Sequence, residues 1–168
     1  MPEGRFVITE VDSTGEPKKP LDVFGLFNAA CGYLVRDHVA ITYRTWRGKL
    51  GDKWAVPDSI KEFMWDKLSQ KFEYLEGCNM AITKHQAIVI MGRIFKNFKG
   101  KLYRDYHLKG RTPGWDDYPI VKDFWNDFVG YRDSEEAKKI SEANKTNSKK
   151  NIYPRRTGSC GYFRKLDE

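Results

Sequence analysis

Apolar residues recur along most of this chain at intervals of three and four, the spacing of one face of an α-helix. Between Leu21 and Val35 the apolar residues at this spacing are Leu21, Phe24, Phe27, Ala30, Cys31 and Leu34. The pattern predicts a helix over Leu21–Val35, although Gly25 and Gly32 each lower helix propensity by about 1 kcal/mol relative to alanine. The segment Val39–Trp54 shows no such period, and we interpret it as a loop.

A second helix is predicted after Pro57-Asp58-Ser59, a sequence typical of a helix start. It should run to about Tyr74 and stop before Gly77. A third and longer helix is expected to begin with Thr83 as its cap and to end at Gly110 and Pro113. Its buried stripe is predicted to be Ala87, Met91, Ile94, Phe95, Phe98, Leu102 and Tyr106.

Two further helices are predicted, over Ile120–Arg132 and Glu135–Lys149. Ser134-Glu135-Glu136 is predicted to begin the last one, with acids where the helix dipole favours them. That helix offers few apolar side chains for packing, namely Ala137, Ile140 and Ala143. Residues 1–20 are polar and contain Gly and Pro, which is typical of a mobile arm, with a short extended piece at Arg5–Thr9.

The elements together predict an all-α fold, a compact bundle of about four to five helices around one long basic helix. The chain of 168 residues is long enough for one domain with a true core. We expect a flexible arm over residues 1–20, a helical domain over residues 21–133, and a solvated helix with a basic tail over residues 134–168.

Charge changes this picture because it is arranged in blocks. The whole chain has a net charge of +7, and residues 81–111 alone carry eight Lys or Arg against one acid. Residues 112–136 have a charge of −5 and residues 137–168 a charge of +6. Either the acidic block neutralises the long helix inside the fold, or both basic blocks line one surface. The second interpretation favours a polyanion as partner, and the commonest polyanion is nucleic acid.

The candidate nucleic-acid-binding residues are the cations of the two basic blocks. Lysines are suited to phosphate contacts, and an arginine can read a guanine edge in the major groove. The candidates are Arg93, Lys96, Lys99, Lys101, Arg104, Lys109, Arg111, Arg155, Arg156, Arg164 and Lys165.

No catalytic or cofactor chemistry is predicted. Cys31, Cys78 and Cys160 are far apart and form neither a CxxC pair nor a metal-ligand spacing with the histidines. The acidic doublet Asp116-Asp117 is interpreted as a helix cap, and no phosphate-binding glycine loop or dinucleotide fingerprint occurs. No apolar run approaches the roughly 18 residues that a membrane-spanning helix needs. We therefore expect a protein that is not an enzyme, binds no cofactor or metal and spans no membrane.

Short motifs occur in a fixed order between Leu21 and Phe163. They are Cys31–Asp37, Ile41–Trp46, Val56–Ser59, Trp65–Leu68, Lys71-Phe72, Met91–Arg93, Lys109–Pro113, Trp125–Val129, Ser134–Lys138, Ser141–Lys145 and Gly158–Tyr162. Together they resemble the plant transposase-related family called Ptta/En/Spm, found in CACTA-type transposons and in host genes derived from them. Cys160 stands where the family has glycine, and the sequence stops near Glu168, where relatives continue into a charged region.

The resemblance implies association with duplex DNA in the nucleus by a protein that does not itself cut strands. A long basic helix among shorter ones also looks Myb- or trihelix-like, which is an analogy at the level of the fold. The alternative hypothesis is a protein-interaction module, in which the helix over Leu21–Val35 or over Glu135–Lys149 forms a homo-oligomer.

Overall fold

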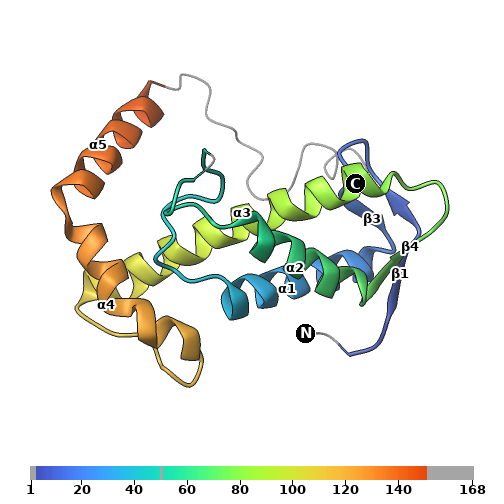
Figure 1. Ribbon diagram of the computed structural model, residues 1–168, viewed down its shortest axis with the longest axis horizontal. Coiled ribbons are helices and arrows are strands. Elements are labelled where there is room, and N and C mark those ends of the chain that lie inside the picture. Colours follow the sequence, from blue (N-terminus) through green and yellow to red (C-terminus); the bar gives the residue numbers. More distant parts are fainter. Residues whose placement is uncertain (1–2, 50, 151–168) are drawn as a thin grey trace. The chain divides into compact units, whose positions relative to one another are not determined.

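The computed structural model describes residues 3–49 and 51–150, and it divides the chain into two compact units, Met1–Val129 and Gly130–Glu168 (Figure 1). The boundary falls a few residues before the one predicted at residue 133. The described residues are mostly helical, as expected, but the prediction of an all-α fold is wrong, because four short strands accompany the helices.

Each of the five predicted helices is present in the described part of the chain, with bounds that differ mainly at the ends. The long basic helix starts and ends a few residues earlier than predicted, and a separate 3-10 turn, η1, takes the last residues of the predicted helix. The helices are α1 (Leu21–His38), α2 (Asp58–Ser69), α3 (Met80–Asp105), η1 (His107–Lys109), α4 (Pro119–Asp133) and α5 (Glu135–Lys149).

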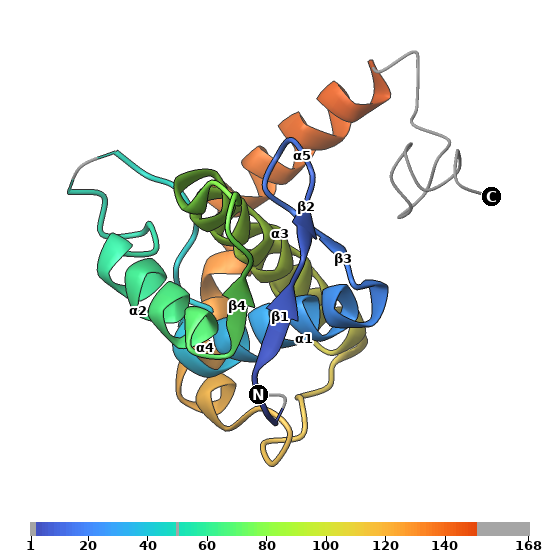
Figure 2. The same ribbon diagram turned by 90° about the vertical axis from the view of Figure 1, so that its right-hand side faces the viewer.

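The strands lie in segments where the sequence predicted an arm and a helix end. Residues 3–20, expected to be a flexible arm, contain β1 (Phe6–Ile8), β2 (Glu10–Val11) and β3 (Pro17–Lys19). β2 and β3 form an antiparallel pair, and β1 pairs in parallel with β4 (Phe72–Tyr74), as Figure 2 shows.

Burial explains why residues 72–74 leave the helix that was predicted to continue to Tyr74. Phe72 is almost fully buried, with its ring stacked 5.5 Å from that of Phe6 and edge-on at 5.2 Å to that of Phe27. The completely buried Ile8 anchors the paired strand β1. The parallel pair of strands provides hydrogen-bond partners for the backbone N–H and C=O groups while Phe72 and Ile8 are buried. This stabilisation outweighs the local preference of residues 72–74 for a helix.

The core of the first unit has two parts, and α3 contributes to both. One half of α3 supplies Ala87, Ile90 and Met91 to a cluster that also contains residues of α1, α2 and β4. The other half supplies Phe98 and Leu102, which pack with Val121, Trp125 and Phe128 of α4. The predicted apolar stripe of the long helix is therefore its buried face.

The start of α3 differs from the prediction. The cap is Asn79, whose side-chain oxygen accepts hydrogen bonds from the N–H groups of Ala81 (3.1 Å) and Ile82 (3.2 Å). Thr83, the predicted cap, is buried inside the first turn and donates its hydroxyl proton to the carbonyl of Asn79. An asparagine acceptor at this position satisfies N–H groups that have no partner within the helix.

The segment between α1 and α2, residues 39–57, is a loop, as predicted, and it packs against α3. The indole of Trp46 lies over Gly92 so closely that a β-carbon at Gly92 would be 2.6 Å from it. Trp46 also contacts the ring of Phe95, with 5.7 Å between ring centroids. Gly92 is therefore a packing site, whereas a β-carbon at Gly100 would meet only the guanidinium end of Arg104, at 3.3 Å.

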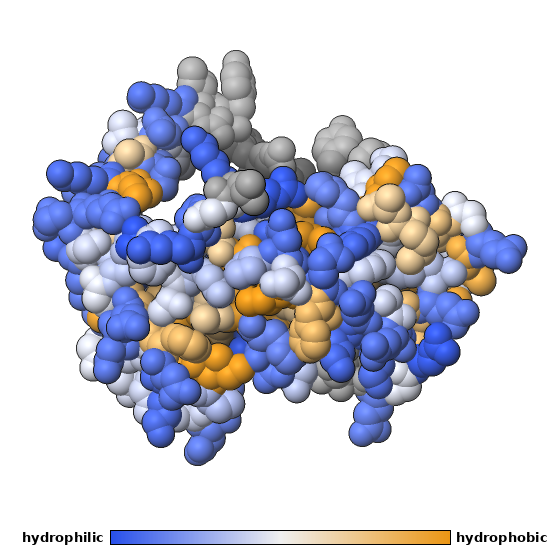
Figure 3. All heavy atoms as spheres, in the orientation of Figure 1, coloured by the Kyte–Doolittle hydropathy of each residue, from blue (hydrophilic) through white to orange (hydrophobic). Residues whose placement is uncertain are grey.

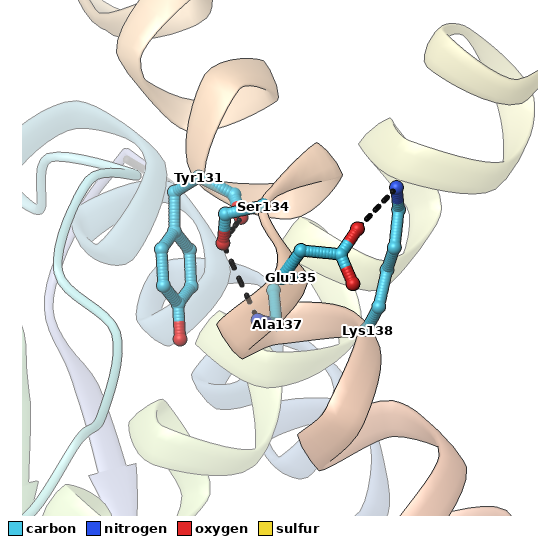
Figure 4. A network of polar contacts seen from close by, with 5 residues as sticks. All are labelled: Tyr131, Ser134, Glu135, Ala137 and Lys138. Atoms are coloured by element: carbon cyan, nitrogen blue, oxygen red, sulfur yellow. Dashed lines mark hydrogen bonds and ion pairs between the residues drawn. The ribbon is translucent and has the colours of Figure 1, made fainter.

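In the second unit, α5 begins with a complete set of local contacts (Figure 4). The Ser134 hydroxyl accepts from the N–H of Ala137 (3.3 Å) and donates to the carbonyl of Tyr131 (2.6 Å). Lys138 pairs with Glu135 across one turn, at 3.4 Å. The predicted start of this helix at Ser134 and Glu135 is confirmed.

The cap of α3 leads to a first prediction. Asn79→Ala should lower the free energy of unfolding by about 1 kcal/mol, because two N–H groups lose their acceptor. Asn79→Asp keeps a side-chain acceptor and should retain most of the stability. Urea denaturation measures both changes, and equal losses in the two variants would show that the side-chain acceptor is unimportant.

The two glycines of α3 give a matched pair of variants. Gly92→Ala should destabilise the fold by about 1–2 kcal/mol, because the Trp46 ring must move and this loss exceeds the gain in helix propensity. Gly100→Ala should stabilise it by up to about 1 kcal/mol, because only a flexible arginine has to shift. Thermal and urea unfolding test the pair, and the same sign for both variants would contradict the packing of Trp46.

Candidate nucleic-acid interface

Four of the predicted cations lie together on the outer side of α3. Arg93 and Lys96 are three residues apart, as are Lys101 and Arg104, and this spacing makes neighbours on a helix surface. All four side chains are exposed, while the intervening Phe95, Phe98 and Leu102 are buried. We call Arg93, Lys96, Lys101 and Arg104 the basic face. It extends for about 16 Å at 1.5 Å per residue.

The cations of the basic face are not neutralised by acids within residues 3–49 and 51–150. No ion pair involves any of the four, and the aspartates that follow α3 in the first unit are exposed. These aspartates are Asp116, Asp117, Asp123 and Asp127. Within the described residues of the first unit, the acidic block therefore does not neutralise the basic face.

Lys99 differs from the other candidates on α3, because its side chain turns towards the protein. Its ammonium group donates to the backbone carbonyl of Tyr43 and lies 4.9 Å from the centroid of the Phe95 ring. The side chain is half-buried between α3 and the 39–57 loop. Lys99 thus links the loop to the helix and stands apart from the basic face.

The other candidates fall into two groups. Lys109 and Arg111 lie just beyond α3, on η1 and on the residue after the left-handed Gly110, and both are exposed. The remaining four, Arg155, Arg156, Arg164 and Lys165, are outside the described residues. The structure therefore brings four predicted cations together, places two in the adjoining turn and assigns Lys99 to a contact within the fold.

Sequence reasoning missed a second group of cations, in the 39–57 loop. Arg47, Lys49 and Lys53 are exposed there, and Trp54 is 39% exposed. The guanidinium carbon of Arg44 lies 4.2 Å from the centroid of the Trp54 ring, and the Lys53 ammonium lies 5.1 Å from it. The available signal was the alternation of cations and tryptophans between residues 44 and 54, without any helical period.

Other candidate chemistry is sparse in the described chain. Its His, Cys, Asp and Glu side chains form no group of three that would hold a metal ion. Burial raises the pKa of the Cys31 thiol and that of the Tyr74 hydroxyl well above their usual ranges, which keeps both groups protonated. No helix in residues 3–49 and 51–150 combines the length and the apolar character needed to cross a membrane.

Comparison with known proteins adds no relative to this description. No family model, curated protein or solved structure matches the chain.

Proposed function

We propose that this chain is a nuclear DNA-binding module that binds duplex DNA without catalysis and is related to plant CACTA transposon proteins. The observation that carries the proposal is the basic face of α3, four exposed cations without a paired acid in the described residues. The motifs that resemble the Ptta/En/Spm family supply the relationship and the nuclear location.

The dimensions of the basic face suit a duplex. About 16 Å of duplex carries roughly nine phosphate charges, at one charge per about 1.7 Å of helix axis. A row of cations of that length therefore meets a dense line of negative charge, and binding releases the counterions condensed on it. An isolated pair of surface lysines would span a shorter length of duplex and contact fewer phosphates.

The roles of the cations follow from their chemistry. Lys96 and Lys101 contact phosphates as point charges, and Arg93 and Arg104 have forked donors that fit either a phosphate or the edge of a guanine. In a Myb- or trihelix-like arrangement, a helix of a small bundle lies in the major groove, and α3 takes that place in the proposal. Lys109 and Arg111 extend the phosphate contacts beyond the helix end.

The alternative is a homo-oligomer, and the observation in its favour concerns α5. Ile140 of that helix is 49% exposed, whereas α1 buries most of its apolar side chains in the core of the first unit, with Leu21 at its start as an exposed exception. Apolar side chains on the face in Figure 3 lie in separate patches among hydrophilic ones. Sedimentation at several protein concentrations, with and without Ile140→Glu, distinguishes this function from DNA binding.

A triple variant tests DNA binding. Replacing Arg93, Lys96 and Arg104 with glutamine should weaken binding to a 25-base-pair duplex and reduce the slope of log K against log salt by about 3, at about 0.9 per lost phosphate contact. Fluorescence anisotropy at four or more salt concentrations measures both quantities.

A control for the triple variant should have the same loss of charge away from the basic face. Arg36, Lys67 and Lys122 are exposed on α1, α2 and α4, and their replacement with glutamine should leave most of the affinity and the salt slope intact. Equal effects in the two triple variants would mean that only net charge matters. Unchanged affinity in the basic-face variant would refute the proposed surface.

A further inference from the structure

We propose that the loop between α1 and α2 forms a second DNA-backbone contact surface beside the basic face, through Arg47, Lys53 and Trp54. We call these three residues the loop platform. The proposal rests on the proposed function, and it adds residues that neither the charge blocks nor the family resemblance pointed to.

Hydrogen bonds join the two described arms of the loop on either side of residue 50. The N–H of Arg44 donates to the carbonyl of Trp54 (2.7 Å), and the N–H of Val56 donates to the carbonyl of Thr45 (3.1 Å). The Asp52 carboxylate accepts from the N–H of Trp54, at 2.9 Å. These contacts place residues 44–45 beside residues 54–56, so Trp54 is fixed next to Arg44 by backbone hydrogen bonds.

The loop is also attached to α3 next to the basic face. Trp46 packs on Gly92, and Lys99 reaches the carbonyl of Tyr43. Lys96 lies four residues after Gly92, one helical turn further along α3, so the attachment borders this cation of the basic face. The platform and the basic face belong to one compact unit, and the loop that carries the platform is attached to α3 beside Lys96.

The chemistry of the platform fits a sugar-phosphate backbone. Arg47 and Lys53 are exposed cations. Trp54 keeps 39% of its surface exposed, although an indole normally gains by burial. An aromatic ring flanked by cations packs against the sugars of the backbone while the cations contact phosphates. An acidic protein would also attract the cations, but the neighbouring row of four cations on α3 favours a longer polyanion.

Because the loop is attached to α3, the position of α3 on the duplex determines which part of the DNA the platform contacts. When α3 lies along a groove of the duplex, a surface at the side of the helix faces the strand that borders the groove. The platform therefore contacts the backbone of that strand, and it positions the protein without reading sequence.

The test compares three double variants in the full chain with the same 25-base-pair duplex. Arg47→Gln with Lys53→Gln removes the platform cations, Arg93→Gln with Lys96→Gln removes half of the basic face, and Lys67→Gln with Lys122→Gln is the matched control. The platform variant should bind on the order of tenfold more weakly at 0.1 M salt and lower the salt slope by about 2. Its effect should be the same for unrelated duplex sequences.

A further variant separates the ring from the charges. Trp54→Ala should weaken binding with little change in salt slope, and Trp54→Phe should restore part of the affinity. Circular dichroism and the thermal midpoint should stay close to wild type for every variant, because all the changed side chains are exposed.

The outcomes distinguish the two proposals. If the basic-face variant loses affinity and salt slope while the platform variant behaves like the control, the platform is refuted and the DNA-binding function stands. If both variants behave like the control, the proposed function fails together with the platform. Protection of Arg47 and Lys53 from chemical modification by bound duplex would support the platform independently.

Discussion

The structure of the first unit depends on one amphipathic helix, α3, whose apolar face is shared by two core clusters. Ala87, Ile90 and Met91 pack with α1, α2 and β4, while Phe98 and Leu102 pack with α4. Burial of apolar area is the dominant favourable term in folding, and the same helix contributes buried side chains to both clusters. Since the apolar side chains fix the rotation of α3, they also decide which of its cations face solvent.

The exposure of the basic face follows from the cost of burying charge. A cation without a partner in a core would lose its hydration, which costs far more than its aliphatic stem gains by packing. Arg93, Lys96 and Arg104 therefore stay outside. A face of like charges in solvent raises the free energy of the fold only modestly in salt, and a bound polyanion removes that repulsion.

The sequence predicted the helices well because long amphipathic segments repeat one signal many times. The helix from Leu21 was found from such a pattern, whereas the one from Glu135 was found from its start at Ser134. The extended piece predicted at Arg5–Thr9 contains β1, but β2, β3 and β4 were missed because two or three residues are too few to show a period. The local pattern places Phe72 in the last turn of the predicted helix. Only its contacts with Phe6 and Phe27, which are tertiary, explain why it lies in a strand.

The cap of α3 was missed for a related reason. Thr83 and Asn79 are both acceptable caps by residue type, and the choice depends on burial. Gly15 of the turn between β2 and β3 lies against the backbone of Ile82 and Thr83, so Thr83 is covered while Asn79 remains at the end of the helix. Only the tertiary contact separates the two alternatives.

The sequence by itself determined that a long helix would have one apolar and one cationic side, because both follow from residue spacing. The tertiary structure decided which cations belong together. Lys99 is not part of the basic face because it donates to the carbonyl of Tyr43, and the 39–57 loop is attached to the helix because Trp46 packs over Gly92. These contacts join residues far apart in the chain, where no local pattern reports them.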